Sequence, residues 1–301
     1  MATGESTTPL SNTSAPMGVS VVIRALNEAQ FLPQCLSQIQ SQQLNLPVEI
    51  ILVDSGSSDG TVDIAHSFGC KVVHIAQADF SFGKALNLGV EQAAYAIVVA
   101  ISAHCIPVGK RWLGRLVAPL LNGTSEMAYG SHLAGRGSRS SEINYFHEKF
   151  CHCSGLKTKP LLNNGNSAFL RQLWATRPFN ELLPAQEDME FSLWHMTHSE
   201  AKLYYCSQSK VLHYHNDRNK TLFKRLYREL SVEFYLGQKN LPQMLKFFAM
   251  VPFFVAKDVI SSYKKGVMRR ALKGIFAFRA VQAAAYVQAF RTHQQFVLGR
   301  A

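Results

Sequence analysis

The stretch Ile50-Ile51-Leu52-Val53-Asp54-Ser55-Gly56-Ser57-Ser58-Asp59-Gly60-Thr61 decides the fold of this chain. Its apolar beginning is typical of a parallel strand that is buried on both faces. The acidic residue and the small turn formers that follow predict a tight turn into a helix. Because ligands of open α/β sheets collect at the carboxyl ends of the strands, Asp54 is a candidate for holding the ribose or base of a nucleotide.

Strand and helix patterns alternate on both sides of this stretch. Apolar runs predict strands at 19–24, 48–54, 71–75 and 96–102, and helical spacing predicts helices at 28–40 and 61–68. This alternation favours an α/β fold with a mostly parallel sheet that is flanked by helices. Short late strands are predicted at 169–170, 204–205 and 211–212, whereas 123–161 has the composition of a loop-rich segment. The sequence has neither Gly-x-Gly-x-x-Gly after the first strand nor a Walker-type loop, which argues against two common nucleotide-binding folds.

The composition is that of a globular protein, with 301 residues of which 47% are apolar and 17% charged. Residues 1–17 are rich in Ser, Thr and Pro and carry a single charge, so we expect a disordered tail there and no signal peptide. The six cysteines are scattered and do not form the framework of a secreted protein. A cytoplasmic location is therefore expected.

The net charge of +11 is concentrated in the last third of the chain. Residues 1–217 hold 15 lysines and arginines against 17 acidic residues, whereas residues 218–301 hold 16 against three. Basic and apolar residues recur at helical spacing from 218 onward, which is typical of amphipathic helices that lie on an anionic membrane. Packing on the rest of the chain or on a partner subunit is the alternative. Nucleic-acid binding is disfavoured, because no recognised binding module accompanies the charge.

Four motifs occur in a fixed order: Val21 to Glu28, the Asp54 turn, Ser102-Ala103-His104-Cys105-Ile106-Pro107, and Glu187-Asp188. In this order they resemble the family-2 glycosyltransferases over residues 18–217. The resemblance implies the GT-A (nucleotide-diphospho-sugar transferase) fold for a catalytic domain at 18–217, with a basic C-terminal helical extension at 218–301. It also implies a nucleotide-diphospho-sugar as the donor.

By the same resemblance, eight residues would contact the nucleotide sugar. They are Arg24, Asn27, Glu28, Asp54, Ser55, Lys84, Ser102 and Ala103. Ser55 stands where the family often has a second Asp. Lys84 would offset the charge of the diphosphate, and its alternative is a solvated surface lysine.

The metal motif departs from the family, which usually has Asp-x-Asp where this chain has Ser102-Ala103-His104. Mg²⁺ prefers carboxylate oxygens, whereas imidazole can bind Mn²⁺. His104 is therefore a candidate metal ligand, and the resemblance implies His213 as a second one, because the fold often presents a late histidine to the metal. The need for a divalent cation, Mn²⁺ or Mg²⁺, stays open at this stage.

Glu187-Asp188 matches the acidic pair from which the family draws its catalytic base. Inverting transfer needs one carboxylate that takes the proton of the acceptor hydroxyl, and we assign this role to Asp188, with Glu187 as its orienting neighbour. The preference of helix N-termini for acidic residues is the alternative for the pair. In the turn at 163–166, Asn164 and Asn166 are candidates for contacts to the sugar or acceptor, and simple turn formation is their alternative.

The sequence thus predicts a cytoplasmic, membrane-peripheral, inverting glycosyltransferase. It would transfer sugar from a nucleotide-diphosphate donor to a saccharide or lipid-linked acceptor in the synthesis of a surface polysaccharide or glycan. The competing hypothesis is a catalytically silent subunit that binds nucleotide sugars or acts as a scaffold. The loss of Asp-x-Asp motivates this alternative, and the retention of Glu187-Asp188 argues against it.

Overall fold

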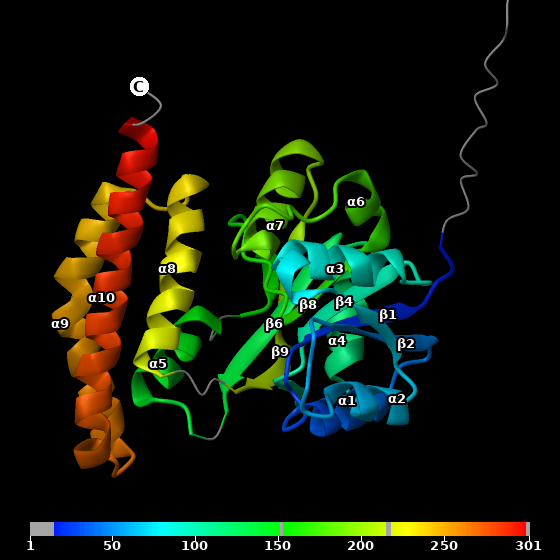
Figure 1. Cartoon of the computed structure of the whole chain (residues 1–301), viewed down its shortest axis with the longest axis horizontal. Coiled ribbons are helices and arrows are strands. Elements are labelled where there is room, and N and C mark those ends of the chain that lie inside the picture. Colours follow the sequence, from blue (N-terminus) through cyan, green and yellow to red (C-terminus); the bar gives the residue numbers. More distant parts are fainter. Residues whose placement is uncertain (1–14, 136, 151–152, 215–217, 299–301) are drawn as a thin grey trace, which may run out of the picture.

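A computed structural model describes residues 15–135, 137–150, 153–214 and 218–298, so most of the expected disordered tail lies outside the described residues. A sheet flanked by helices forms one part of the molecule, and a group of long helices stands beside it (Figure 1). The strands are β1 (Val19–Ala25), β2 (Val48–Asp54), β3 (Lys71–His74), β4 (Ile97–Ser102), β5 (Cys105–Pro107), β6 (Met127–Ala134), β7 (Gly155–Lys157), β8 (Asn166–Leu170) and β9 (Leu203–His213). The α-helices are α1 (Leu32–Gln40), α2 (Thr61–Ser67), α3 (Phe82–Glu91), α4 (Trp112–Leu121), α5 (Ser140–Phe150), α6 (Arg171–Thr176), α7 (Glu187–His198), α8 (Asn219–Tyr235), α9 (Leu241–Lys264) and α10 (Met268–Leu298).

The sheet has the order β3-β2-β1-β4-β8-β6-β9-β5, and β7 pairs with β9. Its first four strands are parallel, as the alternating pattern predicts, and β8 runs antiparallel to both of its neighbours. The register sets Arg24 beside Ser102 and Ala25 beside Asp54, so the ends of β1, β2 and β4 meet at one edge. The strand ends therefore bring the predicted motifs together.

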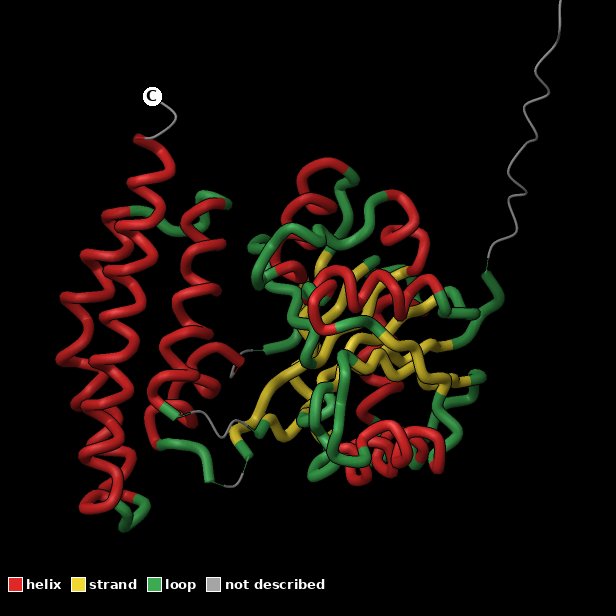
Figure 2. The backbone as a smooth tube through the Cα atoms, viewed as in Figure 1, coloured by secondary structure: helices red, strands yellow, loops and turns green. Residues whose placement is uncertain are grey.

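Alternate residues of β1 enter two separate cores. Val21 and Ile23 pack with α1 and α4, whereas Val22 packs with α3 and α7 on the opposite face of the sheet. Figure 2 shows the strands between these two layers of helices. Because both faces of the central strands are buried, their sequences are mostly apolar.

Three sequence predictions need correction. The helix expected at 28–40 begins at Leu32, with a proline in its first turn, which leaves Glu28 in the preceding loop. The segment 123–161, expected to be loop-rich, contains β6 and α5. The first six residues of β6 are all buried, so the strand shows no alternation of apolar and polar residues. The late strands 204–205 and 211–212 are parts of one strand, β9, and its pairing with β6 shifts in register after Gly130.

The last third of the chain forms a helical bundle of α8, α9 and α10, against which α5 packs. Leu230 and Phe234 of α8 share a core with Ala285 and Tyr286 of α10. None of the described helices is long and apolar enough to cross a membrane. The bundle adjoins the α/β part through α5, a helix that belongs to the front half of the sequence (Figure 1).

A buried ion pair ties α5 to this bundle. Asp258 of α9 accepts hydrogen bonds from the guanidinium of Arg279 on α10 at 2.9 and 3.0 Å and from the amide of Asn144 on α5 at 2.8 Å. Asp258 is fully buried. Because a buried charge requires partners, this network fixes the relative positions of the three helices.

Candidate active site

A cavity of about 290 Å³ opens at the carboxyl ends of the central strands. Strand ends and the chain next to them contribute Arg24, Ser102, His104, His132 and His213 to its lining. The helices α5, α7 and α8 contribute Lys149, Glu187, Asp188, Arg225, Arg228 and Glu229. The cavity therefore combines cations, carboxylates and imidazoles from distant parts of the sequence.

The acidic pair lies at the beginning of α7, where Gln186 adopts a left-handed conformation with φ 58°. The Glu187 carboxylate pairs with the Arg24 guanidinium at 2.8 Å and accepts a longer bond of 3.4 Å from the Asn164 amide. Asp188 accepts the backbone N–H groups of Asn164 and Met189, each at 2.8 Å. The predicted pair is thus held at the cavity from two sides, and Asn164 contacts both of its members.

Burial, followed by the neighbouring charge of Glu187, raises the pKa of the Asp188 carboxyl to about 7. The two backbone hydrogen bonds and the charge of Arg24 act in the opposite direction. A carboxyl with a pKa near neutrality accepts a proton more strongly than an exposed aspartate does. Asp188 therefore has the properties of a general base.

Three histidines, His104, His132 and His213, also line the cavity. The Nδ1 atom of His104 lies 2.6 Å from the Glu28 carboxylate, and the Nδ1 atoms of His132 and His213 lie 3.1 Å apart. His132 is buried, and burial together with the charges of Lys149 and His104 lowers its pKa to about 3. Sequence reasoning missed His132 because it lies within β6, which the pattern did not predict.

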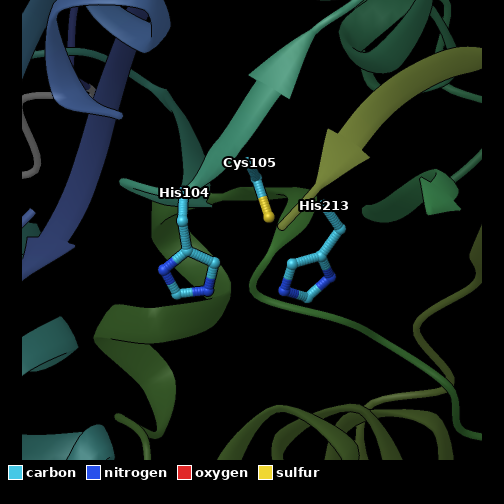
Figure 3. A group of neighbouring side chains, drawn as sticks. All are labelled: His104, Cys105 and His213. Carbon is cyan, nitrogen blue, oxygen red and sulfur yellow. The ribbon is translucent and has the colours of Figure 1, made fainter. Parts of the chain in front are cut away.

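His104, His213 and Cys105 each offer one potential metal ligand, and these atoms lie within 4.8 Å of one another. Figure 3 shows the Cys105 sulfur pointing between the two imidazoles. Burial raises the pKa of the Cys105 thiol well above its ordinary value. Two imidazoles and a thiol do not suit Mg²⁺, which requires oxygen ligands, whereas the imidazoles suit Mn²⁺ or a softer ion.

The residues predicted to contact the nucleotide at the ends of β1 and β2 lie together in neighbouring loops. The Asp54 carboxylate accepts the backbone N–H groups of Gly56 and Ser57, and the side-chain oxygen of Asn27 accepts that of Ser58. Ser55 is buried and donates its hydroxyl to the carbonyl of Ala25. These side chains therefore shape the loop beside the cavity.

Three other predicted residues lie away from the cavity lining. Lys84 is partly exposed and lies 3.9 Å from Asp79 in a surface ion pair. Ala103 is fully buried in the core that contains α1 and α4. Asn166 belongs to β8 instead of the predicted turn. Its side-chain oxygen accepts a hydrogen bond from the Trp112 indole, and its side-chain NH₂ donates to two backbone carbonyls. Lys84 therefore lies in a surface ion pair, and Asn166 lies in a buried hydrogen-bond network.

Comparisons with known proteins agree with this architecture. The family model described as "Glycosyl transferase family 2" matches residues 20–171, about half of the chain. Among solved structures, a mannosyltransferase from Pyrobaculum calidifontis in complex with GDP-Man and Mn²⁺ matches with a TM-score of 0.59 at 15% identity, covering 93% of this chain and 87% of that one. Glucosyl-3-phosphoglycerate synthase from Mycobacterium tuberculosis, in complex with Mn²⁺, UDP-Glc and phosphoglyceric acid, gives 0.52 at 25% identity, covering 69% and 75%.

Two relatives that match in sequence are also named as glycosyltransferases. Glycosyltransferase AglE of Haloferax volcanii is 36% identical over 107 residues, or 34% of this chain and 35% of that protein. This chain thus spans about a third of the length of that relative. The O-antigen chain rhamnosyltransferase RfbN of Salmonella typhimurium is 23% identical over 224 residues, which cover 70% of this chain and 71% of that protein.

Proposed function

The chain belongs to glycosyl transferase family 2, and on this basis we propose that it is an inverting glycosyltransferase with Asp188 as its general base. It would transfer a sugar from a nucleotide-diphosphate donor to a saccharide or lipid-linked acceptor during polysaccharide or glycan synthesis. The observation that carries the proposal is the partly buried Asp188 carboxylate, which lines the cavity beside Glu187, accepts two backbone hydrogen bonds and has a raised pKa. The named activities of the relatives, glycosyl transfer in general and O-antigen rhamnosyl transfer in one case, support the choice of substrates.

The proposed reaction is a single displacement. The acceptor oxygen attacks the anomeric carbon while Asp188 takes its proton, and the bond from that carbon to the diphosphate oxygen breaks with its electron pair leaving on the diphosphate. Attack on the face opposite the leaving group inverts the anomeric configuration. Arg24 holds Glu187 beside Asp188, so Glu187 orients the base and keeps its pKa raised.

The pH dependence follows from the sign of the pKa shift. Only the ionised Asp188 accepts a proton, so kcat/KM should rise with pH through about 7 and then level off. Glu187→Gln should move this midpoint to lower pH for two reasons. It removes the Glu187 charge, which raises the pKa of Asp188, and it releases Arg24 from its ion pair, so that the Arg24 charge lowers the same pKa further. Asp63→Asn on the exposed face of α2 is the control. An unchanged midpoint in Glu187→Gln would contradict the assignment of Asp188.

We propose a divalent cation for the strand-end histidines, with Mn²⁺ favoured over Mg²⁺ by the ligand types. His104 and His213 would hold the ion, and the ion would offset part of the negative charge of the diphosphate. Thermal unfolding with a nucleoside diphosphate should then show extra stabilisation by Mn²⁺ that His104→Ala abolishes. If the nucleoside diphosphate stabilises the protein equally with and without Mn²⁺, and equally in His104→Ala, the proposal is contradicted.

We further propose that residues 18–217 form the catalytic domain and that 218–301 bind the cytoplasmic face of a membrane. Leu245, Phe253, Ile260 and Tyr263 recur at helical spacing along α9 and are 54% to 70% exposed. The only carboxylate between residues 240 and 298 is the buried Asp258. An exposed apolar stripe in a segment with a large excess of cations suits anionic lipid, whereas a second copy of the same face would add charge repulsion.

Flotation with anionic liposomes tests this surface. The triple change Leu245→Ser, Phe253→Ser and Ile260→Ser should markedly reduce the floated fraction, because it removes three apolar contacts with the lipid. The matched control changes three exposed leucines of the α/β part to serine: Leu121, Leu156 and Leu182. Equal flotation of both triple variants would contradict membrane binding through α9.

The catalytically silent subunit remains the second candidate, and the histidine in place of an acidic metal ligand is the observation that favours it. A silent subunit binds nucleotide sugars without consuming them. Donor turnover with a panel of acceptors separates the two functions, because only the enzyme releases a nucleoside diphosphate.

A further inference from the structure

Two cations of the cavity have no carboxylate partner. Lys149 of α5 and Arg228 of α8 both line it, yet neither forms an ion pair with any residue that the structure describes. The Lys149 ammonium lies 5.8 and 5.7 Å from the rings of Tyr145 and Phe150. The Arg228 guanidinium lies 5.6 Å from the ring of Phe82. These ring contacts position both cations without neutralising them.

The charge of Lys149 persists within the cavity. Burial lowers the pKa of its ammonium, but the Tyr145 hydroxyl and the carboxylates of Glu229, Glu233 and Asp188 together raise it above its ordinary value. A cation in such a position, without an ion-pair partner, is a preformed site for an anion. Arg228 adds a planar guanidinium, whose geometry matches phosphate oxygens.

His132 provides a third, independent observation. It is 2% exposed and lines the same cavity, and its Nε2 atom has no hydrogen-bond partner among the described residues. Its other ring nitrogen is already engaged with His213. A buried polar atom without a protein partner, on a residue that lines a cavity, indicates a group from outside the protein that supplies the missing bond.

We propose that Lys149 and Arg228 form a diphosphate-binding subsite, with His132 as an adjoining hydrogen-bonding group. The proposal rests on the proposed function, because sugar transfer from a nucleotide donor brings a diphosphate into this cavity. The strand end where the family usually has Asp-x-Asp carries Ser102-Ala103-His104, so it would offer fewer oxygen ligands to a divalent ion. Cations from α5 and α8 then stabilise the negative charge of the diphosphate directly.

The subsite also assigns a role to the helical bundle in substrate binding. Arg228 belongs to α8, which lies beyond the catalytic domain that the sequence motifs define. Lys149 belongs to α5, which Asn144 and Asp258 tie to α9. Either the diphosphate of the nucleotide donor or that of a lipid-linked acceptor has the required chemistry.

Isothermal titration in the presence of EDTA tests the subsite. The probes are inorganic diphosphate, UDP, GDP and a short-chain polyprenyl diphosphate, titrated into the full chain and its variants. Lys149→Met and Arg228→Met should each weaken binding by about 10-fold or more, the usual effect of losing one charged hydrogen bond. Arg228→Lys should retain part of the affinity. Lys224→Met, an exposed position one turn earlier on α8, is the matched control and should bind as the wild type does.

The outcomes separate the sources of the diphosphate. Weaker binding of UDP or GDP assigns the subsite to the donor, and weaker binding of the polyprenyl diphosphate alone assigns it to the acceptor. Wild-type affinity for all four probes in both methionine variants, with unchanged thermal stability, would overturn the proposal. Asp188→Asn should bind every probe at least as tightly as the wild type, because it removes a negative charge that acts on Lys149, so failure of the proposed catalysis and failure of the subsite give different results.

Discussion

Asp188→Asn is expected to lower kcat by roughly 10²- to 10⁴-fold, the range that general bases contribute. An amide cannot accept the proton of the acceptor hydroxyl, but it has nearly the same shape as the carboxylate. The donor should therefore bind with almost unchanged affinity, because the substitution leaves the cations of the cavity in place. Steady-state kinetics of nucleoside diphosphate release, combined with donor titration, separate these two effects.

The control is Asp63→Asn, which changes an aspartate in the first turn of α2, outside the cavity. It should have wild-type kinetics. A comparable loss of kcat in both variants would indicate a general effect on the fold. Wild-type kcat in Asp188→Asn would exclude Asp188 as the base.

Asp258→Ala is expected to destabilise the protein by about 3–5 kcal/mol, because it leaves the buried Arg279 guanidinium without its partner. The same change removes the acceptor of the Asn144 amide, so α5 loses its polar contact with α9. Equilibrium unfolding in urea measures the change in the free energy of unfolding. A cost below about 1 kcal/mol, typical of exposed ion pairs, would contradict the structural role of this network.

The double variant Asp258→Ala with Arg279→Met distinguishes lost pairing from lost packing. Removal of both charges leaves no uncompensated ion in the bundle, so the double variant should be more stable than Asp258→Ala alone. If the double variant is less stable than the wild type by the sum of the losses in the two single variants, the two side chains do not interact energetically.

The central strands were predictable because burial on both faces leaves a clear signal. The predicted strand 48–54 coincides with β2, and the strand at 96–102 differs from β4 by one residue. Strand ends of a parallel sheet meet at one edge, and Arg24 and His104, which were predicted from two different motifs, both line the cavity there. The resemblance to a family supplied the acidic pair, which no pattern of spacing identifies.

The remainder of the cavity was not predictable, because it depends on tertiary contacts. His132 lies within a strand that has no alternating pattern, and Lys149 lies on a helix within a segment that was expected to be loop-rich. Arg228 was visible as one cation of an amphipathic helix, but helical spacing does not reveal which element the polar face meets. The cavity instead brings this residue beside α5 and the acidic pair.

Transfer of a labelled sugar tests the central claim most directly. Wild type and Asp188→Asn would each be incubated with a panel of nucleotide-diphospho-sugars and with saccharide and lipid-linked acceptors, in the presence of Mn²⁺. We predict that the wild type transfers the sugar from at least one donor with inversion at the anomeric carbon, and that Asp188→Asn transfers it at least roughly 10²-fold more slowly. Equal transfer by the two proteins, or a product with retained configuration, would contradict the account.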